Sequence, residues 1–128
     1  MHKLFKASFI CAAVAFSGAT YAGLAQVNPV AIVTDATGTT TARGSLRDAR
    51  NSADSVAYIG CWVFATASPI AQCLARDASA TFASCVTTDP AMMQAAGSIN
   101  AASFVRFVVG KDGSSCNSVQ VEQLSGNL

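Results

Sequence analysis

The stretch GCWVFATASPIAQCLARDASATFASC, residues 60–85, holds three of the five cysteines and the only tryptophan of the 128-residue chain. Its cysteines, Cys61, Cys73 and Cys85, follow one another at intervals of twelve residues. Apolar and small residues dominate between them, as is typical of buried strands. How these cysteines pair therefore decides how the strands of the fold are tied together.

A central strand is predicted at the start of this stretch, over Ser55–Ala65. Both faces of the alternating pattern are apolar, which indicates a strand covered on both sides. Gly60 interrupts the strand and indicates a bulge or a close backbone neighbour. Tyr58 and Trp62 share one face and could form a ligand platform, but we favour packing in the core.

A secretory signal peptide is predicted over residues 1–25. A basic start and an apolar run over residues 7–16 precede small residues that allow cleavage after Ala22 or Ala25. The run is shorter than the roughly 20 residues of a membrane span. We therefore expect no transmembrane anchor after cleavage, and a periplasmic or secreted protein.

Two disulfides are predicted in the mature chain. Cys11 leaves with the signal, and the four remaining cysteines are an even number in an exported chain. A hairpin that sets Cys73 opposite Cys85 favours a Cys73–Cys85 bond, with Cys61 bonded to Cys116. Cys61–Cys73 with Cys85–Cys116 remains the alternative.

A flexible N-terminal arm is predicted over residues 26–43, ahead of a single disulfide-stapled domain over residues 44–128. The polar, threonine-rich segment 34–43 carries the arm, and a threonine-rich strand is the alternative. Val30–Val33 could form a short edge strand. An exposed arm of this kind could add a strand to a neighbouring protein.

The start of the domain allows two structures. Turn-forming residues at 51–54 favour a hairpin between Gly44–Arg50 and Ser55–Phe64. The alternative is a helix capped by Ser45, with Asp48 three residues further on. The sequence leaves both open, and we favour the hairpin because its second arm is strongly β-forming.

One short helix is predicted over about residues 90–97. Asp89 is suited to the N-cap and Pro90 to the first helical position, where its missing N–H costs nothing. The predicted fold class is therefore α+β: a small antiparallel sheet built from hairpins, with this one helix and two disulfides.

A closing hairpin is predicted between Ser103–Val109 and Ser115–Gln123. With Gly113 in the left-handed region of the turn, the preferred register sets Val105 opposite Val119. Cys116 would then share a face with residues 104 and 108.

Two segments resemble known sequences: GSLRDARNSADSVAYIGCW (44–62) and SCVTTDPAMMQAAGSIN (84–100). Together with the final Asp-Gly hairpin, they resemble a group of short exported cysteine-containing proteins of Gram-negative bacteria. The resemblance covers most of the mature chain. It implies no activity, so no functional residue is carried over from it.

Composition argues against several classes of function. The only histidine is His2, so the mature chain lacks the usual partner for a serine or cysteine nucleophile and the usual catalytic zinc ligand. Without Lys3 and Lys6 the chain keeps six basic and seven acidic residues, too balanced for nucleic-acid binding. No phosphate-binding glycine motif is present. We expect no enzyme, no cofactor and no metal.

The sequence predicts an exported, non-enzymatic interaction or structural module of the cell envelope or extracellular space. Its partner would be a protein, either a second copy or an envelope component. The alternative is a small periplasmic or secreted inhibitor or ligand-binding protein. Arg43, Arg47 and Arg50 could bind an anionic partner, although a solvated face paired with Asp48 and Asp54 is favoured.

Overall fold

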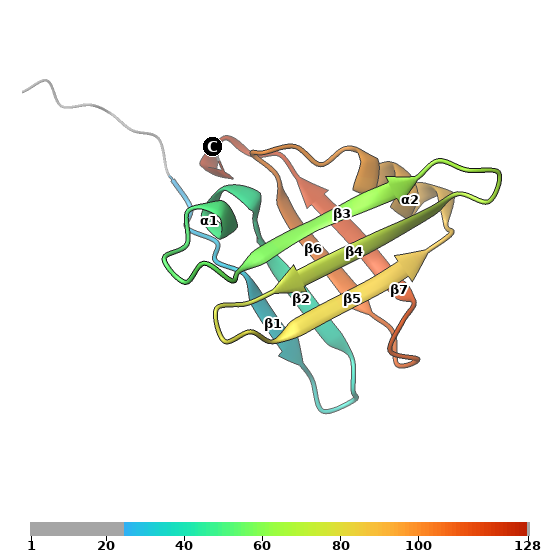
Figure 1. Cartoon of the computed structure of the whole chain (residues 1–128), viewed down its shortest axis with the longest axis horizontal. Coiled ribbons are helices and arrows are strands. Elements are labelled where there is room, and N and C mark those ends of the chain that lie inside the picture. The colour runs from blue at the N-terminus through green and yellow to red at the C-terminus, as the bar shows by residue number, and fades with distance from the viewer. Residues whose placement is uncertain (1–24, 128) are drawn as a thin grey trace, which may run out of the picture.

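Two antiparallel sheets make up the computed structural model, which describes residues 25–127 (Figure 1). The predicted signal peptide therefore falls almost entirely outside the described residues. The four-stranded sheet has the order β1-β2-β6-β7, with β1 (Ala31–Thr34), β2 (Thr40–Ser45), β6 (Phe104–Val109) and β7 (Cys116–Glu122). The three-stranded sheet has the order β3-β4-β5, with β3 (Tyr58–Phe64), β4 (Ile70–Arg76) and β5 (Phe82–Thr87).

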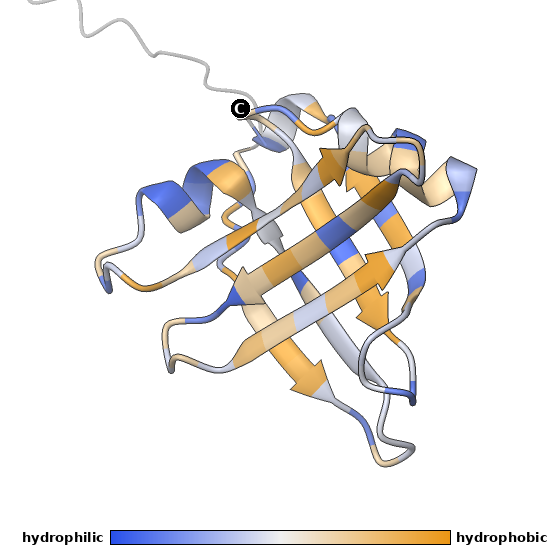
Figure 2. Cartoon of the chain, turned by 45° about the vertical axis from the view of Figure 1, so that its right-hand side comes forward, coloured by the Kyte–Doolittle hydropathy of each residue, from blue (hydrophilic) through white to orange (hydrophobic). Residues whose placement is uncertain are grey.

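The two sheets pack face to face, and their strands cross at a steep angle (Figure 1). Two helices carry the chain between the sheets: α1 (Leu46–Arg50) leads from β2 to β3, and α2 (Pro90–Gly97) from β5 to β6. A short 3-10 helix, Ser125–Asn127, ends the described chain. No helix within residues 25–127 has the length and apolar character that crossing a bilayer requires. Apolar residues run along the strands, and polar residues gather in α1 and the turns (Figure 2).

Helix α1 replaces the hairpin that we favoured for residues 44–64, so that prediction is wrong and the capped-helix alternative is correct. The Ser45 hydroxyl accepts a hydrogen bond from the Asp48 N–H at 3.0 Å and donates one to the Asp48 carboxylate at 2.7 Å. This reciprocal cap stabilises the first turn. Ala49 is buried on the inner side of the helix. Tertiary contacts of this kind stabilise so short a helix.

The flexible arm predicted over residues 26–43 is also wrong, because this segment contains β1 and part of β2. The threonine-rich strand is correct for part of its predicted range: residues 35–39 form a turn, and Thr40–Ser45 pairs with β1 on one side and β6 on the other. The short edge strand is confirmed as β1, at the border of the sheet. Gly44 permits the close packing here, since a Cβ at this position would lie 2.9 Å from the Val30 Cα.

The predicted helix and the β4–β5 hairpin are confirmed. The Asp89 carboxylate caps α2 by accepting a hydrogen bond from the Met92 N–H at 2.9 Å. In the hairpin, Cys73 lies opposite Cys85 and Ala75 opposite Ala83, as predicted.

The β6–β7 hairpin forms, but its predicted register is wrong by two residues. Phe107 lies opposite Val119, and Val105 lies opposite Val121. Gly113 does adopt a positive φ of 77°. A two-residue shift keeps every side chain on its own face, so the core pattern survives the error. A register shift beside Val109 then sets Cys116 opposite Val109, on the inner face rather than with residues 104 and 108.

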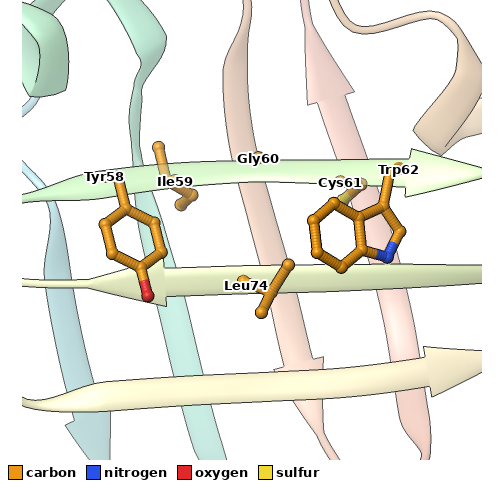
Figure 3. A pocket seen from close by; sticks show the side chains of 6 residues that line it. All are labelled: Tyr58, Ile59, Gly60, Cys61, Trp62 and Leu74. Carbon is orange, nitrogen blue, oxygen red and sulfur yellow. The ribbon is translucent and has the colours of Figure 1, made fainter.

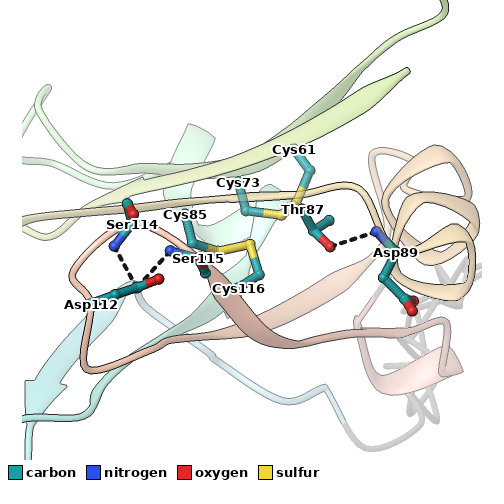
Figure 4. The surroundings of a disulfide bond; sticks show 9 residues. All are labelled: Cys61, Cys73, Cys85, Thr87, Asp89, Asp112, Ser114, Ser115 and Cys116. Atoms are coloured by element: carbon teal, nitrogen blue, oxygen red, sulfur yellow. Dashed lines mark hydrogen bonds between the residues drawn. A yellow bond between two sulfur atoms is a disulfide. The ribbon is translucent and has the colours of Figure 1, made fainter. Parts of the chain in front are cut away.

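The disulfides are Cys61–Cys73 and Cys85–Cys116, so the favoured pairing is wrong and the alternative is correct (Figure 4). Cys73 has a cysteine directly opposite on both neighbouring strands. Its Cα lies only 4.0 Å from that of Cys61, the spacing of a narrow, non-hydrogen-bonded pair. An antiparallel strand that makes a narrow pair on one side makes a wide one on the other. Cys85 is therefore left to bond Cys116 across the sheets.

Strand β3 lies at an edge of the three-stranded sheet, so the predicted central strand is wrong. Only its inner face is covered: Ile59 is buried, whereas Tyr58, Trp62 and Phe64 are exposed. The fold class itself is confirmed, since the protein is an α+β structure of antiparallel hairpins with a helix at 90–97 and two disulfides. The predicted sheet is divided into two.

Candidate functional site

The outer face of the three-stranded sheet, which points away from the four-stranded sheet, is the most unusual surface of the molecule. Strand alternation and register place these residues on it: Tyr58, Gly60, Trp62 and Phe64 from β3; Ile70, Gln72, Leu74 and Arg76 from β4; Phe82, Ser84 and Val86 from β5. Four of its residues are aromatic and about half exposed: Tyr58 at 43%, Phe64 at 49%, Trp62 at 50% and Phe82 at 52%. Large exposed apolar surfaces of this kind mark interaction sites.

The inner face of the same sheet carries small residues instead. Ala71, Cys73 and Ala75 of β4 are fully buried, and Ala83 and Cys85 of β5 nearly so. These small side chains let the sheet pack closely against Phe107, which fills the space between the sheets. Apart from Ile59 and Val63, the large residues of β3–β5 are consequently left on the outside.

The rings of Tyr58 and Trp62 lie across β4 and present their faces outward (Figure 3). A hydrogen bond fixes the indole in this position, because Trp62 Nε1 donates to Gln72 Oε1 at 3.2 Å. Phe64 supports the other side of the indole edge to face, with ring centroids 5.9 Å apart and planes at 74°. The exposed indole is therefore held in place on both sides.

A hollow of about 380 Å³ lies between the two rings; we call it the Gly60 hollow. Leu74 lies between the rings in Figure 3, and Gly60 contributes no side chain. A Cβ built at Gly60 would have no atom within 4 Å. Packing thus does not require glycine here, and its effect is to keep the space between the rings open.

Arg76 is the only charged residue of the outer face. Its Nε lies 3.5 Å from the Ala80 carbonyl oxygen, at the limit of a hydrogen bond. Within residues 25–127 the only ion pair is Arg47–Asp48, so Arg76 has no carboxylate partner there. The face therefore offers stacking surfaces, a few hydrogen-bonding groups and one cation.

A second hollow, of about 400 Å³, lies between α1 and the start of β3; we call it the α1 hollow. Arg47 and Arg50 line it together with Leu46, Ile59 and Tyr58. The Arg47 guanidinium donates to the Gln26 carbonyl oxygen at 2.7 Å and pairs with Asp48 at 3.2 Å. It is thus already engaged by groups of the protein.

The three arginines of the predicted anionic-partner surface come from two consecutive elements. Arg43 lies on β2, opposite Arg106 of β6, whereas Arg47 and Arg50 lie on α1. The pairing of Arg47 with Asp48 agrees with the favoured solvated face. Asp54 instead accepts hydrogen bonds from the Val56 and Ala57 N–H groups at 2.8 and 2.7 Å.

These local hydrogen bonds govern the carboxylates. The Ala57 and Val56 N–H groups lower the pKa of Asp54. Burial opposes ionisation of Asp48, but hydrogen bonds from Asn28, Ser45 and Arg47 outweigh it and lower its pKa. Hydrogen bonds from the hydroxyl and N–H of Ser115 and from the Ser114 N–H lower the pKa of Asp112 to about 2. Each carboxylate is thus stabilised in its charged form by its own turn or cap.

All four cysteines of the described chain are in disulfides. Across residues 25–127, no group of three or more His, Cys, Asp or Glu side chains gathers in a way that could hold a metal ion.

The free edge of β3 is a further feature that the sequence did not reveal. Because Cys61 and Cys73 form a narrow pair, the N–H and C=O groups of Cys61 point away from β4. Those of Ile59 and Val63 do the same by alternation. Among the described residues none of the three makes a backbone hydrogen bond beyond the β3–β4 pair.

Sequence reasoning placed Tyr58 and Trp62 on one face correctly but assigned that face to the core. A signal for exposure was present in the neighbouring strands. Ala71, Ala75 and Ala83 alternate with larger residues along β4 and β5. Small side chains allow close packing against a second sheet, so the face that carries the alanines is the buried one.

Comparison of the chain with protein-family models, with curated proteins and with solved structures gives no match. The function must therefore be argued from the surfaces described above.

Proposed function

We propose that the protein is an exported, non-enzymatic binding module whose ligand lies on the outer face of the β3-β4-β5 sheet. One observation carries the proposal: four aromatic side chains, each about half exposed, stand on a single face of a regular sheet. Exposing such residues forgoes the free energy of burying them, so a partner that covers them recovers it.

The disulfides favour a rigid surface. Cys61–Cys73 joins β3 to β4 directly behind the aromatic residues, and Cys85–Cys116 joins β5 to the four-stranded sheet (Figure 4). A face held in this way loses little conformational freedom when a ligand binds. Two disulfides are also compatible with export, since they persist in oxidising compartments.

Binding to cell-envelope material tests the proposal. The oxidised mature protein is mixed with isolated envelope fragments, and the fraction that sediments with them is measured. We expect W62A/F82A to lose most of the retention. V33A removes a side chain that is 61% exposed on β1, outside the outer face, and serves as the matched control. Equal retention of all three proteins would exclude the outer face as the binding surface.

A second candidate function, subunit of an assembly, is favoured by the free edge of β3. This edge is seven residues long and carries neither charge nor proline, two of the usual protections against strand pairing, while helices α1 and α2 contact β3. Pairing with a second copy would extend the sheet. The Thr-rich segment cannot supply the added strand without leaving β2.

Sedimentation velocity over a wide concentration range tests the second candidate. Self-association that V63K abolishes would support it, because Val63 is 40% exposed and a charge there opposes edge pairing. A monomer at all concentrations would exclude it.

A further inference from the structure

We propose that the outer face binds a linear polysaccharide of β-linked pyranose rings, which stack on Tyr58 and Trp62 across the Gly60 hollow. The proposal rests on the function proposed above and specifies its ligand class. The orientation and spacing of the rings, the hydrogen-bonding groups between them, and the size and charge of the face all favour this ligand class.

Ring orientation favours a flat ligand with apolar faces. Tyr58 and Trp62 show their ring faces to solvent instead of their edges (Figure 3). A pyranose whose substituents are equatorial presents a face of C–H groups, and these groups fit against the electron-rich face of an aromatic ring. The hydrogen bond from Trp62 Nε1 to Gln72 Oε1 holds the indole ring against the sheet in the absence of a ligand.

Spacing favours a chain over a single sugar. Tyr58 and Trp62 are four residues apart on one strand, which separates their Cα atoms by about 13 Å. That distance is the length of a short oligosaccharide. Gly60 and Leu74 leave the surface low between the rings, so a flat chain can lie on both rings at once. Equatorial β-linkages give a chain of this flat form.

Hydrogen-bonding groups lie between the stacking surfaces. Gln72 uses its Oε1 for Trp62 and leaves its amide N–H groups free to donate. The hydroxyls of Tyr58 and Ser84 make no hydrogen bond within residues 25–127. Sugar hydroxyls both donate and accept, so they match this set. A purely apolar ligand would leave these groups unpaired.

Charge argues against a membrane surface. Anionic lipid surfaces bind clusters of basic residues, each adding about 1 kcal/mol. The outer face has Arg76 alone, and no carboxylate. This charge pattern suits a ligand that is neutral over most of its length.

The dimensions of the face suit an oligosaccharide. Three strands of about seven residues cover a footprint of about 23 by 14 Å. The long side of this footprint accommodates a chain of several linked pyranose rings, and the short side accommodates its width.

The single tryptophan permits a direct test, because all indole fluorescence comes from Trp62. The oxidised mature protein is titrated with cellohexaose and, separately, with chitohexaose. We expect at least one of them to shift the emission saturably, with a dissociation constant in the micromolar to millimolar range. No shift with either up to about 10 mM would overturn the proposal.

The variant Gly60→Val tests whether the hexasaccharide binds at the Gly60 hollow. The new side chain enters open space, so the variant should fold with an unchanged or raised melting temperature. It should nevertheless weaken hexasaccharide binding at least tenfold, since it fills the hollow between the rings. V33A should change binding less than twofold. Wild-type affinity in Gly60→Val would overturn the proposed site. Calorimetry with W62A, which should abolish binding, repeats the test without the fluorescent reporter.

The outcomes separate this inference from the function on which it rests. If neither hexasaccharide binds but W62A/F82A still loses envelope retention, the ligand class is wrong and the binding module stands. If neither hexasaccharide binds and the single variant W62A abolishes self-association, the outer face binds a second copy of the chain and the proposed ligand class is wrong. If retention does not depend on the face, both proposals fail.

Discussion

The two sheets point most of their large side chains in opposite directions, toward the core in one sheet and toward solvent in the other. The four-stranded sheet turns Val105, Phe107 and Val109 inward and carries Arg43 and Arg106 outward. In the three-stranded sheet the inward residues are mostly alanines and cysteines, with Ile59 the largest one that is buried, and the aromatic residues face solvent. The strands of the three-stranded sheet are nevertheless the more apolar set in sequence. Hydropathy therefore does not by itself identify the covered face of a strand.

The difference follows from the limited space between the sheets. Protein interiors pack at a nearly constant density. Where large side chains of one sheet fill the volume between two sheets, the other sheet has room only for small side chains. Phe107 and Val105, both fully buried, fill it from the four-stranded sheet. The facing positions must then be small, and the large residues of β3–β5 become available for binding.

Truncating one large residue on each sheet should give the largest contrast. Phe107→Ala should destabilise the protein by about 3–5 kcal/mol, because a fully buried ring is removed and a cavity remains. Trp62→Ala should cost about 1 kcal/mol or less, because the indole is 50% exposed. Urea unfolding of the oxidised proteins measures both. Similar costs would mean that the outer face is part of the core.

Removing each disulfide should give a smaller difference in the free energy of unfolding than the Phe107 and Trp62 variants give. In the chain-entropy model, removing the 31-residue Cys85–Cys116 link costs about 3.7 kcal/mol and the 12-residue Cys61–Cys73 link about 2.8 kcal/mol. The Cys→Ala double variants, compared by urea unfolding, measure the difference. Mass mapping of Cys–Cys peptides under non-reducing conditions is the control. Finding a Cys73–Cys85 peptide would contradict the structure.

The two strand glycines should respond with opposite signs. Gly44→Ala should destabilise by about 1–3 kcal/mol, because the new methyl group meets the Val30 backbone at 2.9 Å. Gly60→Ala should stabilise by about 0.5–1 kcal/mol, since its methyl group enters open space and glycine weakens a strand. Thermal unfolding of both variants checks the signs. Stabilisation by Gly44→Ala would show that residues 26–43 do not pack as β1 and β2.

The smallest effect concerns the turn that brings β7 against β5. The Asp112 carboxylate should titrate with a pKa of about 2, below its ordinary 3.8, and Ser115→Ala should raise that pKa (Figure 4). Because the folded-state pKa is lowered, the turn stabilises the fold fully above pH 3.8 and loses this effect as the pH falls through 2. Carboxyl chemical shifts measured by NMR against pH test this, and an unchanged pKa in Ser115→Ala would contradict it.

Local signals in the sequence determined a good part of this protein. Asp89-Pro90 determined where α2 begins, because a cap and a fixed φ act within one turn. Turn residues and alternation determined the β4–β5 hairpin and which residues of β6 and β7 share a face, except for Cys116 beside the register shift. The even cysteine count predicted two disulfides.

Only the tertiary structure decided which cysteines pair and which face of β3 is covered. Cys73 faces a cysteine on each side, and the choice depends on which strand pair is narrow at that level. Tyr58 and Trp62 lie on one face by alternation, but their exposure depends on Phe107, which is far away in sequence and already fills the space between the sheets. Packing between distant segments is not encoded in any local pattern, and it is this packing that produced the candidate binding face.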